Sequence, residues 1–163
     1  MPDLPDGVAV LAGEPIHDVN VVCLRRIPDE RGTILHMLRE TDAHFRRFGE
    51  IYFTTIYRDV VKGWHTHREM TLNYACVFGR IKLVLYDGRE DSPTRGGLME
   101  VFMGTDSHLL TVIPPGVTNG MKGMAQPFAI VANCATHTHA PGRTTRDEPF
   151  GDAVPYDWAV RNH

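Results

Sequence analysis

Several features of other protein classes are missing from this 163-residue sequence. Its three cysteines make an odd number, and Cys76 and Cys134 stand in apolar, strand-like sequence where cysteine packs as a small hydrophobe, so no disulfide framework is expected. The N-terminal residues lack the basic segment and apolar run of a signal peptide, and no apolar run approaches the roughly 20 residues that span a bilayer. We therefore expect a soluble, cytoplasmic protein without membrane contact.

A strong charge of one sign is also lacking. The net charge is -3, and the lysines and arginines are scattered along the chain rather than clustered. Nucleic acids and anionic lipid surfaces attract clustered basic residues, so neither is expected as a partner. A single ligand that carries phosphate groups remains compatible with this composition.

Short apolar runs dominate the chain and are separated by 15 glycines and 11 prolines. This texture predicts an all-β protein, with many strands joined by turns and no long helix. The length suits one domain over residues 1–163, with extended N-terminal strands in 1–48 and a loose C-terminal tail over 141–163. Residues 86–97 read as a polar loop carrying solvated charge. The expected strands, which suit a jelly roll or barrel, cover 19–26, 33–38, 49–58, 71–78, 80–86, 98–103, 109–113 and 128–134.

Two histidines one residue apart are the most informative feature. In an extended segment His65 and His67 point to the same face, so their imidazoles can converge on one ligand. Such a pair suits metal coordination, and it equally suits proton transfer, because the ordinary pKa of histidine lies near 6.5. The alternative is that both histidines are ordinary polar residues on a solvent-exposed face of a strand. The surrounding sequence has to decide between these readings.

That surrounding sequence resembles the two motifs of cupin barrels. The glutamate that follows the histidine pair in cupins is replaced here by Thr71 and Leu72, and the histidine of the second motif by Asn119. A stable transition-metal site normally needs three protein ligands, so we expect no bound metal and no other cofactor. The residues that carry the resemblance are Gly63, His65, His67 and Gly79 for the first motif, and Pro114, Gly116 and Asn119 for the second.

Within the cupins, the chain resembles the dTDP-4-dehydrorhamnose 3,5-epimerase family. The resemblance implies a cupin jelly-roll β-barrel that forms a homodimer, needs no metal, and binds a nucleotide-linked 4-keto sugar in its cavity. The matching pieces, in family order, are "PDERG" at 28–32, "VVKGWH" at 60–65, "LYDGREDSPTRG" at 85–96, "VIPPGVTNGMKG" at 112–123 and "VPYDW" at 154–158.

Catalytic roles follow from this resemblance. A ketone acidifies the hydrogens on neighbouring carbons, so one group must remove a proton and another must return one to the opposite face. His65 matches the family's base, and Asp147 or its neighbour Glu148 matches the acidic residue that orients this base. The family's acid is a tyrosine that is absent here, and His139 is the best-aligned replacement.

Further residues are candidates for substrate binding. Lys62 stands where the family has an arginine suited to a pyrophosphate, and Arg31 matches a residue that reaches into the neighbouring subunit's pocket. His67, Tyr74, Asn119 and His137 complete the predicted binding set.

Three functions remain open at this point. The first is a divergent epimerase acting on a keto sugar nucleotide, or a related sugar 3,4-ketoisomerase. The second is a metal-dependent cupin that uses His65, His67, His137 and His139. The third is a sugar-binding module without catalytic activity.

Overall fold

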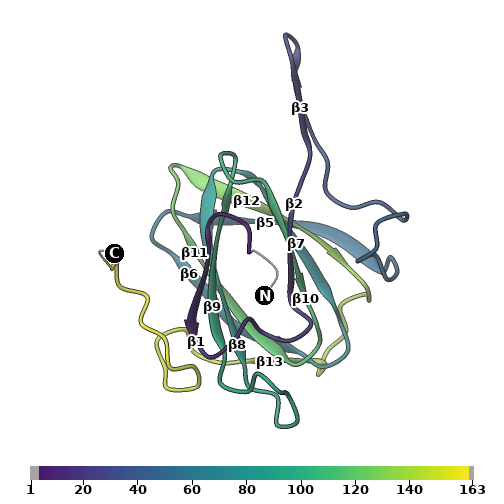
Figure 1. The fold of residues 1–163 in the computed structure, drawn as a ribbon. Helices are drawn as coiled ribbons and strands as arrows, with labels where there is room; N and C mark the ends of the chain where they lie inside the picture. Colours follow the sequence, from purple (N-terminus) through teal and green to yellow (C-terminus); the bar gives the residue numbers. More distant parts are fainter. Residues whose placement is uncertain (1–3, 162–163) are drawn as a thin grey trace.

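The computed structural model of the chain describes residues 4–161, which form strands joined by turns and loops (Figure 1). Every strand pair in these residues is antiparallel. The described part of the chain contains no helix that is long and apolar enough to cross a membrane. These strands build an all-β jelly-roll barrel, which confirms the predicted fold class.

Two sheets form the barrel, and a separate hairpin projects from it. The six-stranded sheet has the order β1 (Val8–Ala12), β9 (Leu98–Gly104), β8 (Arg80–Asp87), β11 (Val117–Gly123), β6 (Val61–His67) and β13 (Thr144–Arg146). The five-stranded sheet has the order β2 (Asn20–Cys23), β10 (Leu109–Ile113), β7 (Leu72–Phe78), β12 (Phe128–Ala135) and β5 (Glu50–Tyr57). The hairpin pairs β3 (Arg26–Asp29) with β4 (Gly32–Leu35).

Most predicted strands agree with the structure, and the strands that were missed are the short apolar β1, "VAVLA", and three strands rich in glycine or polar residues. The segment predicted over 19–26 is divided between β2 and β3. Strands β1, β6, β11 and β13 were not predicted as strands. Glycines and polar residues fill β6, "VKGWHTH", and β11, "VTNGMKG", so pairing with their neighbours, rather than local propensity, makes them strands.

The main core lies between the two sheets. Leu72, Leu83 and Val131 are at most 1% exposed in it. A second apolar cluster covers the outer face of the six-stranded sheet, where the ring of Trp64 packs 5.0 Å from that of Trp158. The C-terminal segment is therefore not a loose tail: β13 pairs with β6, and Trp158 is buried against the sheet.

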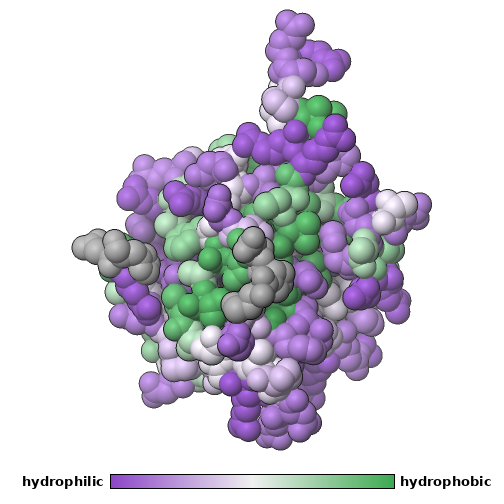
Figure 2. Space-filling model, in the orientation of Figure 1, coloured by the Kyte–Doolittle hydropathy of each residue, from purple (hydrophilic) through white to green (hydrophobic). Residues whose placement is uncertain are grey.

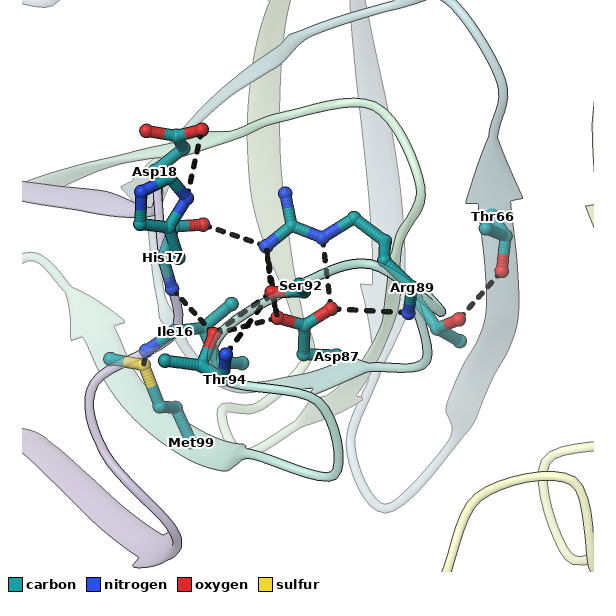
Figure 3. Close-up of polar contacts among 10 residues, drawn as sticks. Ile16, His17, Asp18, Thr66, Asp87, Arg89, Ser92, Thr94 and Met99 are labelled. Atoms are coloured by element: carbon teal, nitrogen blue, oxygen red, sulfur yellow. Dashed lines mark hydrogen bonds and ion pairs between the residues drawn. The ribbon is translucent and has the colours of Figure 1, made fainter.

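The polar loop at 86–97 is organised by a buried carboxylate (Figure 3). Asp87 is fully buried and accepts hydrogen bonds from the Arg89 guanidinium at 2.8 and 2.9 Å. The hydroxyls of Ser92 and Thr94 donate to the same carboxylate at 2.6 and 2.7 Å. The expectation of solvated charge holds for the exposed Glu90, Asp91 and Arg95 but not for Asp87, around which the loop folds.

The β3–β4 hairpin extends away from the barrel (Figure 1). Figure 2 shows a hydrophilic surface at the hairpin tip and a hydrophobic patch lower down. Arg31, at the tip, pairs with Asp29 of the same turn at 2.6 Å and has a side chain that is 86% exposed. Ile34 is 60% exposed. The hairpin thus presents both a charge and an apolar group to the outside of the protomer.

Candidate active site

A cleft with a volume of about 720 Å³ opens between β5 and β6, where the edges of the two sheets approach each other. Its inner part reaches Tyr74 and Met121 in the barrel. Pockets of this size suit small-molecule and cofactor ligands. We call it the histidine cleft, and its walls include Glu50, Tyr52, Lys62, His65, His67, His139 and Arg146.

The local sequence explains how β6 presents its histidines. A Cβ atom on Gly63 would lie 2.9 Å from the Cα atom of Gly120, so glycine at position 63 lets β6 approach β11 closely. The Pro-Pro-Gly turn is anchored to the site, because the Gly116 amide donates to the carbonyl of His67 at 2.8 Å. Gly116 adopts a positive φ of 83°, which favours glycine. These contacts fix the strand from which both imidazoles project.

Strand β13 supplies residues on the other side of β6. Arg146 is paired in register with His65, and Thr144 with His67. Directly opposed residues of antiparallel strands lie on the same face of the sheet, so Arg146 and Thr144 share the face of the two histidines. The Thr144 hydroxyl is 3.0 Å from Nδ1 of His67. This contact holds one imidazole in place.

The electrostatic environment keeps both imidazoles uncharged. Burial lowers the pKa of His65, and the positive charges of Arg146 and Lys62 lower it further. Burial also lowers the pKa of His67, to about 4, helped by the nearby His65, His139 and Arg146. Both side chains are therefore neutral near pH 7. A neutral imidazole can accept a proton, which is the state that a general base requires.

The same cations make the cleft suited to an anion. The side chain of Lys62 extends from β6 to β5. Its Nζ donates there to the Thr54 hydroxyl at 2.9 Å and to the Thr55 carbonyl at 2.6 Å. An ammonium group has three donors, so one remains for a ligand. The ion pairs within residues 4–161 include neither Lys62 nor Arg146. Both positive charges are thus available to phosphate oxygens.

Several predicted site residues come together in this cleft. His65, His67, His139, Lys62 and Tyr74 all line it or its inner part. His139 lies at its exposed rim, where its backbone amide donates to the Glu50 carboxylate at 3.0 Å. The structure therefore assembles residues from β6, β7 and the segment after β12 around one space.

Asp147 does not join them. Its amide and carbonyl exchange hydrogen bonds with those of Trp64 at 3.0 and 2.7 Å, so the two residues are directly opposed. Asp147 therefore shares the face of Trp64, whose ring packs in the outer apolar cluster, and not the face of His65. Glu148, the alternative, is exposed and does not line the cleft. Arg146, one residue earlier, occupies the position opposite the proposed base.

Three predicted binding residues also lie outside the cleft. Asn119 is 1% exposed, and its side-chain amide donates to the backbone carbonyl of His65 at 3.1 Å, so it holds β6 in place from the neighbouring strand β11. His137 is 3.0 Å from the Thr136 hydroxyl and lies behind the cleft wall. Arg31 is on the projecting hairpin. None of the three faces the cleft within this protomer.

The geometry does not favour the metal-dependent alternative. Among the described residues, no three side chains of His, Cys, Asp or Glu converge closely enough to hold an ion. The four histidines of that alternative do not share one space, because His137 lines a neighbouring small pocket with His67 and His139, and His65 is not part of that pocket. The residues present therefore do not fit a metal centre.

The site residues predicted from the sequence do not include Arg146, Glu50 and Tyr52, which line the cleft. Arg146 belongs to a three-residue strand in what reads as a tail, and nothing in its spacing indicates that it pairs with His65. Glu50 and Tyr52 alternate along a strand that was predicted, so the alternation places them on one face. Which face lines the cleft depends on the pairing of β5 with β12.

A second cavity, of about 300 Å³, lies on the outer face of the six-stranded sheet between Lys82, Glu100 and Arg161. Among the described residues, those that line it include no histidine or tyrosine. The neutral histidines and free cations favour the histidine cleft as the functional site.

Comparisons with known proteins agree with this architecture. The profile of the dTDP-4-dehydrorhamnose 3,5-epimerase family matches residues 14–161. A probable low-salt glycan biosynthesis epimerase from Haloferax volcanii is 31% identical over 144 residues, covering 87% of this chain and 89% of that protein. The spore coat polysaccharide biosynthesis protein SpsL from Bacillus subtilis is 29% identical, covering 87% and 91%.

Among solved structures, a dTDP sugar isomerase from Desulfovibrio desulfuricans superposes with a TM-score of 0.85 at 40% identity, covering 90% of this chain and 94% of that one. NovW, a 4-keto-6-deoxy sugar epimerase from Streptomyces spheroides, shares the fold with a TM-score of 0.81 at 20% identity, covering 98% and 84%. The chain belongs to the dTDP-4-dehydrorhamnose 3,5-epimerase family and is a divergent nucleotide-sugar epimerase.

Proposed function

We propose that this protein epimerises a nucleotide diphosphate-linked 4-keto-6-deoxyhexose, with His65 as the base that removes a proton beside the ketone. The observation that carries the proposal is a neutral imidazole, flanked by Lys62 and Arg146, inside a cleft of suitable size. The related proteins named as acting on dTDP sugars or 4-keto-6-deoxy sugars support this substrate class.

The charges of the cleft suggest how the ligand binds. The diphosphate carries the negative charge that Lys62 and Arg146 attract, and the sugar then lies beside β6 with His65 and His67. Binding of the diphosphate also offsets the cations that disfavour a charged imidazole. His65 consequently becomes a stronger base when substrate is bound, and the imidazolium formed after proton removal is stabilised by the same anion.

The reaction follows from the acidity of the sugar. His65 takes the proton from the carbon next to the ketone, and the electron pair moves into an enolate. A proton returned to the opposite face inverts the centre.

Product analysis tests this proposal. The protein is incubated with a dTDP-4-keto-6-deoxyhexose, and the ring-proton coupling constants of the product are read by NMR. An inverted centre at C3 or C5 supports the proposal. A carbonyl moved to C3 would instead identify a ketoisomerase, and an unchanged but bound sugar would identify a binding module. Either of these results would overturn it.

We further infer that the protein is a homodimer. Strand β5 is the edge of its sheet, and its outward side chains Ile51, Phe53 and Tyr57 are 51%, 63% and 65% exposed. A long apolar edge strand is normally covered, and a second copy with the projecting β3–β4 hairpin supplies a cover. In this arrangement Arg31 leaves its own protomer and approaches the partner's cleft.

The dimer is tested by light scattering coupled to size-exclusion chromatography. Wild type is expected at twice the mass of the 18.3 kDa chain, and Phe53→Glu at the mass of one chain. Arg31→Ala should remain dimeric and raise KM about tenfold, the loss of one charge-assisted hydrogen bond. A monomeric wild type would contradict the inference.

We also infer a cytoplasmic location. Cys23, Cys76 and Cys134 are all free thiols in the structure, which suits a reducing compartment. Fractionation of the source cells tests this, and recovery of the protein outside the cytoplasm would contradict it.

A further inference from the structure

Two tyrosines face His65 from the opposite sheet. Tyr52 is on β5 and Tyr74 on β7, both in the five-stranded sheet, whereas His65 is on β6 of the six-stranded sheet. All three line the inner part of the histidine cleft. Inversion of a carbon requires proton carriers on its two faces. A sugar bound between the sheets has an imidazole on one side and phenol groups on the other.

A buried asparagine orients one of these phenols. Asn133 on β12 lies between the two tyrosines, paired in register with Tyr52 on one side and Tyr74 on the other. Its side-chain oxygen accepts a hydrogen bond from the backbone N–H of Asn73 at 3.0 Å, which fixes the direction of the side chain. Its Nδ2 donates to the Tyr52 hydroxyl oxygen at 3.0 Å. The Tyr52 hydroxyl proton therefore does not point toward Asn133 and can be donated to a ligand in the cleft.

This arrangement favours donation of the Tyr52 proton. Because the oxygen accepts a hydrogen bond from Asn133, the negative charge that remains after proton loss is stabilised by a fixed donor. Tyr52 is 39% exposed, which allows contact with a ligand in the cleft and later reprotonation from water.

Tyr74 supports Tyr52 from within the barrel. It is 5% exposed, and burial together with the neighbouring Tyr52 hydroxyl raises the pKa of Tyr74 well above its ordinary value. Tyr74 therefore keeps its proton, and its side chain lines the inner part of the cleft together with that of Tyr52. Tyr74 and Asn133 are positioning residues in this scheme, because they act through Tyr52.

His139, the donor expected from the sequence, is less well placed. Its side chain is exposed at the rim of the cleft. Within residues 4–161 its ring makes no hydrogen bond, and only its backbone amide is held, by Glu50. The hydroxyl of Tyr52, by contrast, is held by a hydrogen bond, so Tyr52 is the better-placed proton donor.

We propose that Tyr52 is the proton donor that completes the inversion, an assignment that rests on the proposed epimerase function. His65 removes the proton from one face of the carbon beside the ketone, and the enolate then forms a new C–H bond with the Tyr52 hydroxyl proton on the opposite face. The products of this step are the ketone, an imidazolium at His65 and a phenolate at Tyr52. Water returns a proton to Tyr52 and removes one from His65.

The test separates proton removal from inversion. Wild type, Tyr52→Phe and His139→Gln are incubated with a dTDP-4-keto-6-deoxyhexose in deuterated water, and proton NMR follows loss of the ring proton and appearance of the epimer. Tyr86→Phe is the matched control, because Tyr86 lies on β8, packs against the outer apolar cluster and does not line the cleft. Thermal melting establishes that each variant is folded.

Tyr52→Phe is expected to slow inversion by about 100-fold or more, the scale of general acid catalysis, while deuterium still enters on the His65 face with retention of configuration. Tyr86→Phe should invert at a rate within about threefold of wild type, and His139→Gln should retain inversion, with the ratio of inversion to exchange that wild type shows. Tyr74→Phe should lower kcat about tenfold with little change in KM and should shift the alkaline limb of its pH profile.

Inversion by Tyr52→Phe at the wild-type rate would overturn the assignment, and so would loss of inversion in His139→Gln. Loss of both exchange and inversion in Tyr52→Phe would overturn it as well, because a donor is not needed for proton removal. A wild-type protein that shows neither exchange nor inversion would instead refute the proposed function, so the two failures are distinguishable.

Discussion

The Asp87 loop and the histidine cleft both gather charged and polar side chains in one barrel, but the charges are paired within the loop and unpaired in the cleft. In the loop, the buried Asp87 carboxylate is matched by donors from Arg89, Ser92 and Thr94. In the cleft, the ion pairs among the described residues leave Lys62 and Arg146 without a carboxylate partner. A satisfied network stabilises the fold, whereas an unsatisfied one is available to a ligand.

The protonation states show the same contrast. Burial alone would raise the pKa of Asp87, but its hydrogen bonds from Arg89, Ser92 and Thr94 outweigh burial and lower that pKa well below the ordinary value. For His65, burial and nearby cations act in the same direction and favour the uncharged form. The loop stabilises a charged carboxylate, whereas the cleft keeps an imidazole uncharged and able to accept a proton.

The largest effect on stability is expected in the loop. Asp87→Ala should lower the free energy of unfolding by about 3 kcal/mol, because it leaves a partly buried Arg89 without its counter-ion. Asp91→Ala, in the same loop but exposed, should change it by less than about 0.5 kcal/mol. Urea denaturation measures both. Equal effects of the two substitutions would show that the Asp87 network contributes nothing special.

The next largest effect concerns the free cation of the cleft. Lys62→Met should weaken binding of a dTDP sugar about tenfold or more, the contribution of one hydrogen bond to a charged group, as measured by calorimetry. It should also move the acid limb of the pH–rate profile upward, because the positive charge of Lys62 lowers the pKa of His65. Arg143→Met, whose guanidinium already pairs with Glu69, is the control. Similar losses in both variants would contradict a specific role for Lys62.

A smaller effect is expected on stability as the pH falls. The pKa of His67 is about 4 in the folded protein and near 6.5 in the unfolded chain, so the unfolded state binds more protons between these values. Stability should therefore be unaffected by His67 above about pH 6.5 and fall by roughly 2 kcal/mol toward pH 4.

Urea unfolding of wild type and His67→Gln from pH 7.5 to 4.5 isolates this contribution, since other titrating groups cancel in the difference. The variant should show the shallower slope. Parallel slopes would mean that His67 is not held neutral by its surroundings.

The smallest expected effect tests the orientation of His67. Thr144→Val should lower the free energy of unfolding by about 1 kcal/mol or less, because it removes one partly buried hydrogen bond. Its effect on kcat should exceed that of Thr145→Val, whose residue is exposed on the opposite face of β13. Equal kcat values for both variants would contradict a role for the Thr144 contact in the site.

The sequence predicts most strands of this fold that are dense in apolar residues, the short β1 excepted, and it predicts less well the strands whose formation depends on their pairing partners. Strands β7, β8, β10 and β12 are rich in branched and aromatic residues, and their predicted positions agree closely with the structure. Strand β13 has three polar residues and exists because β6 offers a free edge. Its register could not be inferred from local sequence, and that register places Arg146 rather than Asp147 opposite His65.

The sequence likewise predicts the part of the site that depends on local pattern and not the part that depends on strand pairing. The alternation of a strand is a local property, and it correctly placed His65 and His67 on one face. The family resemblance directed attention to the tail and to the residues after β12. The tyrosine pair around Asn133 depends on three strands that are distant in sequence, so no local pattern indicates it.

Solvent exchange at the sugar carbons is the most direct test that His65 is the base. In deuterated water, wild type should replace the hydrogen at C3 or C5 of a dTDP-4-keto-6-deoxyhexose with deuterium. His65→Asn should reduce that rate by 100-fold or more, the scale of general base catalysis, while keeping the wild-type melting temperature. A folded His65→Asn variant that exchanges at the wild-type rate would show that another group removes the proton.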